Sequence, residues 1–85
     1  MSKKEKLLKK AIKSPGNLMF KEFKTLIGQY GFEHRNTKGD HEIYKNLAIG
    51  KMLNIQPDKN DKSKAKKYQI KEFINILKNN GLLED

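Results

Sequence analysis

The chain contains no cysteine, and this absence removes several kinds of site at once. Without thiols it forms no disulfide, offers no thiolate nucleophile and builds no cysteine-based zinc site. A small domain without disulfides is typical of a reducing compartment, so we expect a cytoplasmic protein. Two histidines are too few for a structural metal cage, and we expect neither a metal nor another cofactor.

Long apolar runs are also missing. No stretch approaches the roughly 20 apolar residues that cross a membrane. The lysines near the N-terminus are not followed by the apolar segment of a signal peptide, so we expect no membrane partner. With 85 residues, the chain is predicted to form a single domain over 1–85, in which most apolar residues are needed for the core.

Arginine is scarce, although the formal charge is +9 and Lys and Arg together number 19. Arg35 is the only arginine. Such a charge favours an anionic partner, most commonly the backbone of a nucleic acid. Because lysine acts as a point charge, whereas arginine reads guanine edges, we expect backbone contacts rather than base readout. The alternative is a solvated surface that only keeps the protein soluble.

Three segments carry apolar residues at helical spacing. The pattern predicts helices over Lys3–Lys13, Leu18–Tyr30 and Lys67–Asn79, with Asn17 as N-cap of the second and Gly31 at its end. The apolar stripe of the first helix is narrow. That helix therefore packs on the domain edge, on another protein or on a second copy, which leaves a homodimer open.

A polar, extended segment, turn residues and, in the last segment, alternation between apolar and polar residues predict three strands. They span Phe32–Lys38, His41–Lys45 and Lys51–Gln56, followed by a solvated loop over Pro57–Lys66. The element order gives a small two-layer α+β domain, (α)-α-β-β-β-α, with a three-stranded antiparallel sheet. The second and last helices should cover one face of this small sheet and leave the other for a partner.

Four of these segments have an order and spacing that resemble the HicA family of toxin–antitoxin ribonucleases. They are Tyr30 to Phe32, Lys38 to Tyr44, Leu53 to Lys59 and Lys66 to Ile70, within a match from Phe20 to Leu82. The resemblance implies a core over 17–83 with a fold like that of double-stranded-RNA-binding domains, preceded by a helical extension over 1–16. It also implies a type II toxin, an mRNA interferase, whose partners are single-stranded or structured mRNA and a HicB-like antitoxin that covers the site.

In that family the turn reads Gly-Ser-His and its histidine cleaves mRNA, which implies His41 as the catalytic residue. The chain departs from the pattern at Asp40, which puts a negative charge beside the expected phosphate and bears on activity rather than fold. Asp40 either hydrogen-bonds the imidazole, lies on the opposite face, or satisfies backbone N–H groups of the turn.

RNA supplies its own nucleophile, the 2′-hydroxyl, so cleavage requires only a base and cations that stabilise charge on phosphorus. Histidine suits the role of base because it changes charge near neutral pH. Our hypothesis makes His41 the general base of a metal-independent endoribonuclease. The residues expected to bind the RNA backbone are Lys38, Lys45, Lys64, Lys66 and Lys67. The general acid stays open among His34, Tyr44 and a lysine.

Strand alternation gives this hypothesis a geometric condition. His41 and Ile43 share a face, so His41 points toward the helices if Ile43 belongs to the core. Tyr44 then faces the other way and either stacks on a base or packs, and His34 lies half-buried on the face of Phe32. If His41 is an ordinary polar strand residue, two other functions remain: a non-catalytic RNA-binding module of the same fold, and a basic domain that docks an acidic protein.

Overall fold

The computed structural model describes residues 3–83, so 1–2 and 84–85, the two ends of the predicted domain, lie outside the described residues. The elements are α1 (Lys3–Lys13), the short 3-10 helix η1 (Pro15–Asn17), α2 (Phe20–Gln29), β1 (Glu33–Lys38), β2 (His41–Asn46), β3 (Lys51–Ile55) and α3 (Lys67–Asn79). The predicted α+β class and element order are confirmed. Hydrophobic periodicity marks the helices and β3, whereas β1 is polar and exposed along its whole length.

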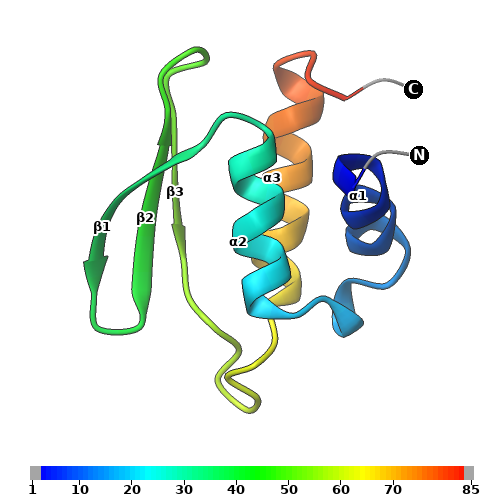
Figure 1. Cartoon of the computed structure of the whole chain (residues 1–85), viewed down its shortest axis with the longest axis vertical. Helices are drawn as coiled ribbons and strands as arrows, with labels where there is room; N and C mark the ends of the chain where they lie inside the picture. Colours follow the sequence, from blue (N-terminus) through cyan, green and yellow to red (C-terminus); the bar gives the residue numbers. More distant parts are fainter. Residues whose placement is uncertain (1–2, 84–85) are drawn as a thin grey trace.

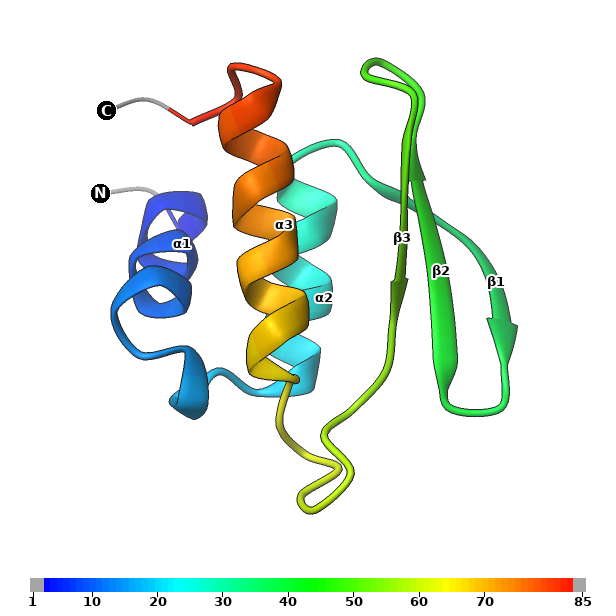
Figure 2. The same cartoon turned by 180° about the vertical axis from the view of Figure 1, so that it is seen from behind.

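The three strands form an antiparallel sheet in the order β1-β2-β3. Helices α2 and α3 lie side by side over one face of the sheet, as predicted, and the other face is uncovered (Figure 1). On the far side of these two helices lies α1, which adds a third layer (Figure 2). The sheet therefore has one face in the core and one face free, which we call the open face.

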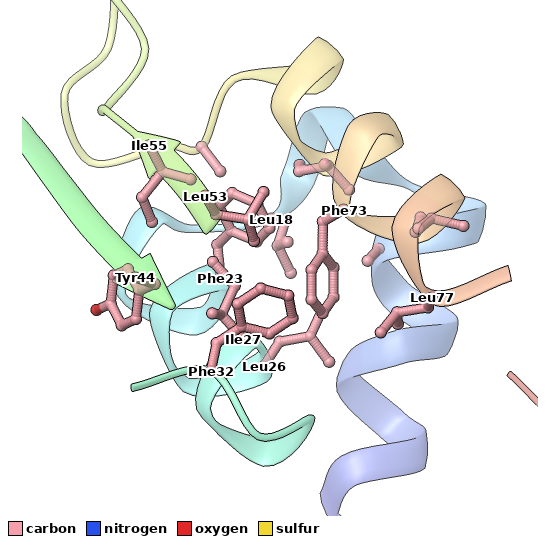
Figure 3. Packing of buried hydrophobic residues seen from close by; sticks show 14 residues of the cluster. Leu18, Phe23, Leu26, Ile27, Phe32, Tyr44, Leu53, Ile55, Phe73 and Leu77 are labelled. Atoms are coloured by element: carbon pink, nitrogen blue, oxygen red, sulfur yellow. The ribbon is translucent and has the colours of Figure 1, made fainter. Parts of the chain in front are cut away.

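The core lies between the sheet and the two covering helices (Figure 3). Its centre is Phe73 of α3, which is fully buried. The rings of Phe23, Tyr30 and Phe32 meet it edge-on, with centroids 5.9, 6.0 and 5.8 Å away. Edge-to-face geometry is favourable because the positive edge of one ring meets the negative face of another. The predicted apolar positions of α3 are thus confirmed as the central packing residues.

Helix α1 packs on its own domain. Ala11 is buried, and Leu7 and Leu8 pack against the core as partly buried residues. The ammonium of Lys10 lies 2.9 Å from Oε1 of Glu22, which ties α1 to the start of α2. Of the three placements that the narrow stripe left open, the structure shows packing on the domain itself.

The predicted N-cap of α2 is wrong. Asn17 ends η1, and Met19 is the N-cap. Leu18 and Met19 are extended, and the segment pairs with the loop after β3. The N–H of Ala65 donates to the carbonyl of Leu18 at 3.0 Å, and the N–H of Phe20 donates to the carbonyl of Ser63 at 2.8 Å. This long-range pairing gives hydrogen-bond partners to the carbonyl of Leu18 and the N–H of Phe20, and the helix begins at Phe20 and not directly after Asn17.

Asn46 fixes the end of β2 to the end of α2. Its side chain is buried, its amide N–H donates to the carbonyl of Tyr30 at 3.0 Å, and its amide oxygen accepts the N–H groups of Ala48 and Ile49. The amide lies against Gly31, whose φ of 90° is the left-handed end predicted for α2. One buried side chain thus organises both the β2–β3 turn and the connection into β1.

Replacing Asn46 by alanine should destabilise the domain by about 1–3 kcal/mol, because partly buried backbone groups lose their partners. Urea unfolding followed by circular dichroism measures the loss. The matched control is Asn75→Ala, at an exposed site on α3, which should leave stability unchanged or slightly higher. Equal midpoints for Asn46→Ala and the wild type would contradict the role of Asn46.

Glu22 makes stability depend on pH. The N–H of Met19 donates to its carboxylate at 3.0 Å, and this bond, followed by the bond from Lys10, lowers the pKa of Glu22 below its ordinary 4.5. The pKa of Glu22 is lower in the folded chain than in the unfolded chain. At pH above the unfolded-state pKa, the ionised carboxylate therefore stabilises the fold, and this stabilisation is lost as the pH falls through the folded-state pKa.

Glu22→Gln should therefore flatten the fall in stability between neutral and acidic pH, and at neutral pH it should cost about 0.5–1 kcal/mol. Unfolding midpoints across the pH range measure both effects. Glu72→Gln, at an exposed site on α3, is the control. A pH profile of Glu22→Gln parallel to that of the wild type would show that the carboxylate stabilises nothing.

Candidate functional site

The orientation of β2 decides where His41 points. Tyr44 and Asn46 are buried, so alternate residues of this strand face the helices. His41, Ile43 and Lys45 consequently lie on the open face. Ile43 is partly buried on that face and is not part of the core. His41 would have pointed toward the helices only if Ile43 belonged to the core, so His41 points away from them.

The neighbouring strands complete the open face. Residues paired across an antiparallel sheet share a face, and Lys38 of β1 pairs with His41, while Asn54 and Met52 of β3 pair with Ile43 and Lys45. Met52 is 59% exposed. Two of the predicted RNA-binding lysines, Lys38 and Lys45, are thus brought to the same face as the histidine, beside an exposed apolar side chain.

Asn54 holds the imidazole of His41. Nδ1 lies 3.0 Å from Oδ1 of Asn54, and because an amide oxygen only accepts, Nδ1 carries the proton of this bond. His41 is exposed, and within the described part of the chain its ring makes no further hydrogen bond. In the neutral ring Nε2 is then the unprotonated nitrogen, available to accept a proton from a ligand on the open face.

The turn before His41 has the geometry that its sequence predicts. Gly39 has a φ of 60°, and Asp40 after it does not have a positive φ, which is the pattern of a type II′ hairpin. Oδ2 of Asp40 accepts from the ammonium of Lys62 at 2.7 Å. This hydrogen bond is the main cause that lowers the pKa of Asp40. The structure therefore pairs Asp40 with a lysine of the loop after β3 and not with the imidazole.

That loop is ordered by its own side chains. Oδ1 of Asp58 accepts the N–H groups of Asn60 and Asp61, and Oδ1 of Asp61 accepts from the backbone and hydroxyl of Ser63. Ala65 is buried, which corrects the expectation of an entirely solvated loop. The physical reason is the pairing with residues 18–20, which anchors the loop to the start of α2.

The other three lysines predicted to bind RNA, Lys64 and Lys66 of this loop and Lys67 at the start of α3, make contacts elsewhere. The backbone of Lys64 bridges to Met19, the ammonium of Lys66 lies 5.7 Å from the ring centre of Tyr68, and the Lys67 side chain approaches Gly16 of η1. Lys62, which the sequence reasoning did not single out, is the loop lysine that reaches the turn of His41. No local pattern marks it, because its partner is 22 residues away.

Two of the candidates for the general acid lie on the other side of the sheet. Tyr44 is buried, and this burial, followed by the charge of Glu42, raises the pKa of its hydroxyl. His34 pairs with Tyr44 across the strands and meets its ring edge-on, with Nε2 3.3 Å from Glu42 and 2.9 Å from the hydroxyl of Thr37. At 44% side-chain exposure, His34 is more open than the half-buried position expected for it. A lysine is the remaining candidate.

Other classes of site leave no trace in the described part of the chain. Residues 3–83 contain no group of three or more His, Asp or Glu side chains arranged to hold a metal ion. None of the helices in this range has the length and apolar character to cross a membrane. Comparison of the chain with protein-family models, curated proteins and solved structures finds no match.

Lys62→Ala should raise the pKa of Asp40 toward the ordinary 3.8, because the ammonium that stabilises the carboxylate is removed. An NMR titration of the side-chain carboxyl carbons measures this pKa. The matched control is Lys59→Ala, an exposed lysine of the same loop, which should leave the Asp40 titration unchanged. Identical titrations in the wild type and Lys62→Ala would show that the ion pair does not form in solution.

Proposed function

We propose that the protein is a metal-independent endoribonuclease that cleaves mRNA with His41 as general base. The observation that carries the proposal is the hydrogen bond from Nδ1 of His41 to Asn54, which fixes the ring on the exposed, lysine-bearing face of the sheet.

The reaction is a transesterification within the RNA. Nε2 of His41 takes the proton of a 2′-hydroxyl, and the 2′-oxygen bonds to the adjacent phosphorus as the bond to the 5′-oxygen breaks. The products are a 2′,3′-cyclic phosphate and a 5′-hydroxyl. Lys38, directly across the strands from His41, is placed to stabilise the charge that builds on the phosphoryl oxygens. As the lysine that pairs with His41 across the strands, it also supplies a proton to the leaving oxygen.

Asp40 is compatible with this chemistry because its charge is offset by Lys62. The expected phosphate therefore lies beside a neutral ion pair and not beside an unpaired carboxylate. Lys45 extends the cationic face along β2. We assign the backbone contacts near the reacting phosphate to Lys38 and Lys45, and more distant contacts to Lys64, Lys66 and Lys67.

The resemblance to the HicA family supports the same proposal. The order α2-β1-β2-β3-α3 and the position of His41 directly after the β1–β2 turn are what that resemblance implies. On this basis we propose that the protein acts in the cytoplasm as the toxin of a toxin–antitoxin pair. A HicB-like antitoxin would silence it by covering the open face, where His41 and the two lysines are accessible.

His41→Ala should reduce the rate of RNA cleavage by about 10²–10⁴-fold, the usual contribution of a general base. The assay incubates the purified protein with a labelled RNA in the presence of a chelator and identifies the termini of the products. His34→Ala is the matched control: it removes the other histidine, on the opposite side of the sheet, and should cleave at nearly the rate of the wild type.

Three results would each overturn the proposal. They are intact RNA with the wild type, equal cleavage by His41→Ala, and products that carry a 3′-hydroxyl and a 5′-phosphate. If RNA stays intact but binds, the non-catalytic RNA-binding module is the function. If RNA does not bind, the remaining function is that of a basic domain for an acidic protein.

A further inference from the structure

A shallow hollow lies at the end of the molecule that carries the β1–β2 turn. Its volume is about 300 Å³, and its lining residues are Met19, Phe20, Lys21, Lys24, Lys62 and Ser63. The hollow is built by the start of α2 and the loop after β3, which the hydrogen bond from Phe20 to Ser63 holds together. Figure 1 shows these two segments and the β1–β2 turn at the same end of the chain's fold.

Two ion pairs connect this hollow to the residues on either side of His41. Lys62 pairs with Asp40 at 2.7 Å, and Lys24 pairs with Glu42 at 3.1 Å. Because side chains alternate along β2, Glu42 points toward the helices while His41 points to the open face. The hollow and the imidazole are therefore on opposite sides of the same strand end, with the hairpin turn between them.

The lining combines an apolar floor with a cationic rim. Met19 is 36% exposed, Phe20 is partly buried, and the ammonium of Lys24 lies 5.3 Å from the centre of the Phe20 ring. Among the side chains that the structure describes, Lys21 has no ion-pair partner, so its charge is free for a ligand. A ligand with a flat apolar group joined to an anionic group can contact both the apolar floor and the cationic rim.

We infer that the hollow binds one nucleotide of a single-stranded RNA, with the base against Met19 and Phe20 and its phosphate on the lysines of the rim. The inference rests on the proposed function for its substrate class. Bases stack on aromatic side chains irrespective of sequence, and lysines neutralise the backbone between them. A strand that reaches from the hollow around the β1–β2 turn arrives at His41, so the hollow would position the RNA for cleavage.

The test uses a short oligouridylate with 2′-O-methyl groups, which cannot react through its 2′-oxygen. Amide NMR signals of residues 19–21 and 62–63 should shift on titration with this oligonucleotide. They should also shift with uridine monophosphate, at higher concentration. Ribose 5-phosphate and inorganic phosphate, which lack the base, should shift them much less. Equal shifts with inorganic phosphate would overturn the inference in favour of a simple anion site.

Lys21→Glu should weaken binding of the oligouridylate about tenfold, since it replaces a rim cation with an anion. The matched control is Lys9→Glu, which makes the same change in net charge at an exposed site on α1 and should weaken binding far less. Equal weakening by the two variants would show that only the overall charge acts, and would also overturn the inference.

These outcomes are separable from those of the cleavage experiment. A protein that shifts at residues 19–21 and 62–63 but leaves ordinary RNA intact keeps the nucleotide site and loses the proposed activity. A protein that cleaves RNA through His41 but shows no shift at these residues keeps the activity and loses the nucleotide site.

Discussion

The burial of Tyr44 on the central strand is the constraint on which the site depends. Since side chains alternate along β2, turning Tyr44 and Asn46 into the core places His41 and Lys45 outside. A shift of one residue in the register would exchange the two sets and bury the imidazole against the helices. Asn46 opposes such a shift, because its amide is bonded to the end of α2 as well as to the β2–β3 turn.

The sequence predicts the elements well and the faces of β2 poorly. The helices and β3 follow from hydrophobic periodicity, and β1 follows from the turn that ends it. In contrast, β2 has two adjacent apolar residues, Ile43 and Tyr44, either of which could face the core. The pairing of the strands decides between them. Tyr44 lies opposite Leu53, and because the apolar Leu53 alternates with the polar Asn54, the side of Leu53 is the buried side. The face of β2 is thus set by β3, and a single segment cannot reveal it.

The separation of interacting residues along the chain also explains which site residues could be predicted from the sequence. His41 and Lys38 flank a turn that Gly39 marks, so their proximity is local and predictable. Asn54 and Lys62 reach that turn from 13 and 22 residues away, and nothing in their own segments signals a partner. The N-cap at Met19 was missed for a similar cause, since residues 18–20 pair with a loop far along the chain. Side chains that organise the site through tertiary contacts became visible only with the fold.

The arrangement around the β1–β2 turn bears on the kind of RNA that the proposed activity would use. A cationic face carries His41 on one side of the strand end, and a cation-rimmed hollow lies on the other, linked through Asp40 and Glu42. An A-form duplex presents phosphates and 2′-hydroxyls but keeps its bases stacked inside, so it has no free base to place in a hollow. A single strand bends around a turn and exposes its bases. If both surfaces act on one RNA, the fold favours an unpaired segment.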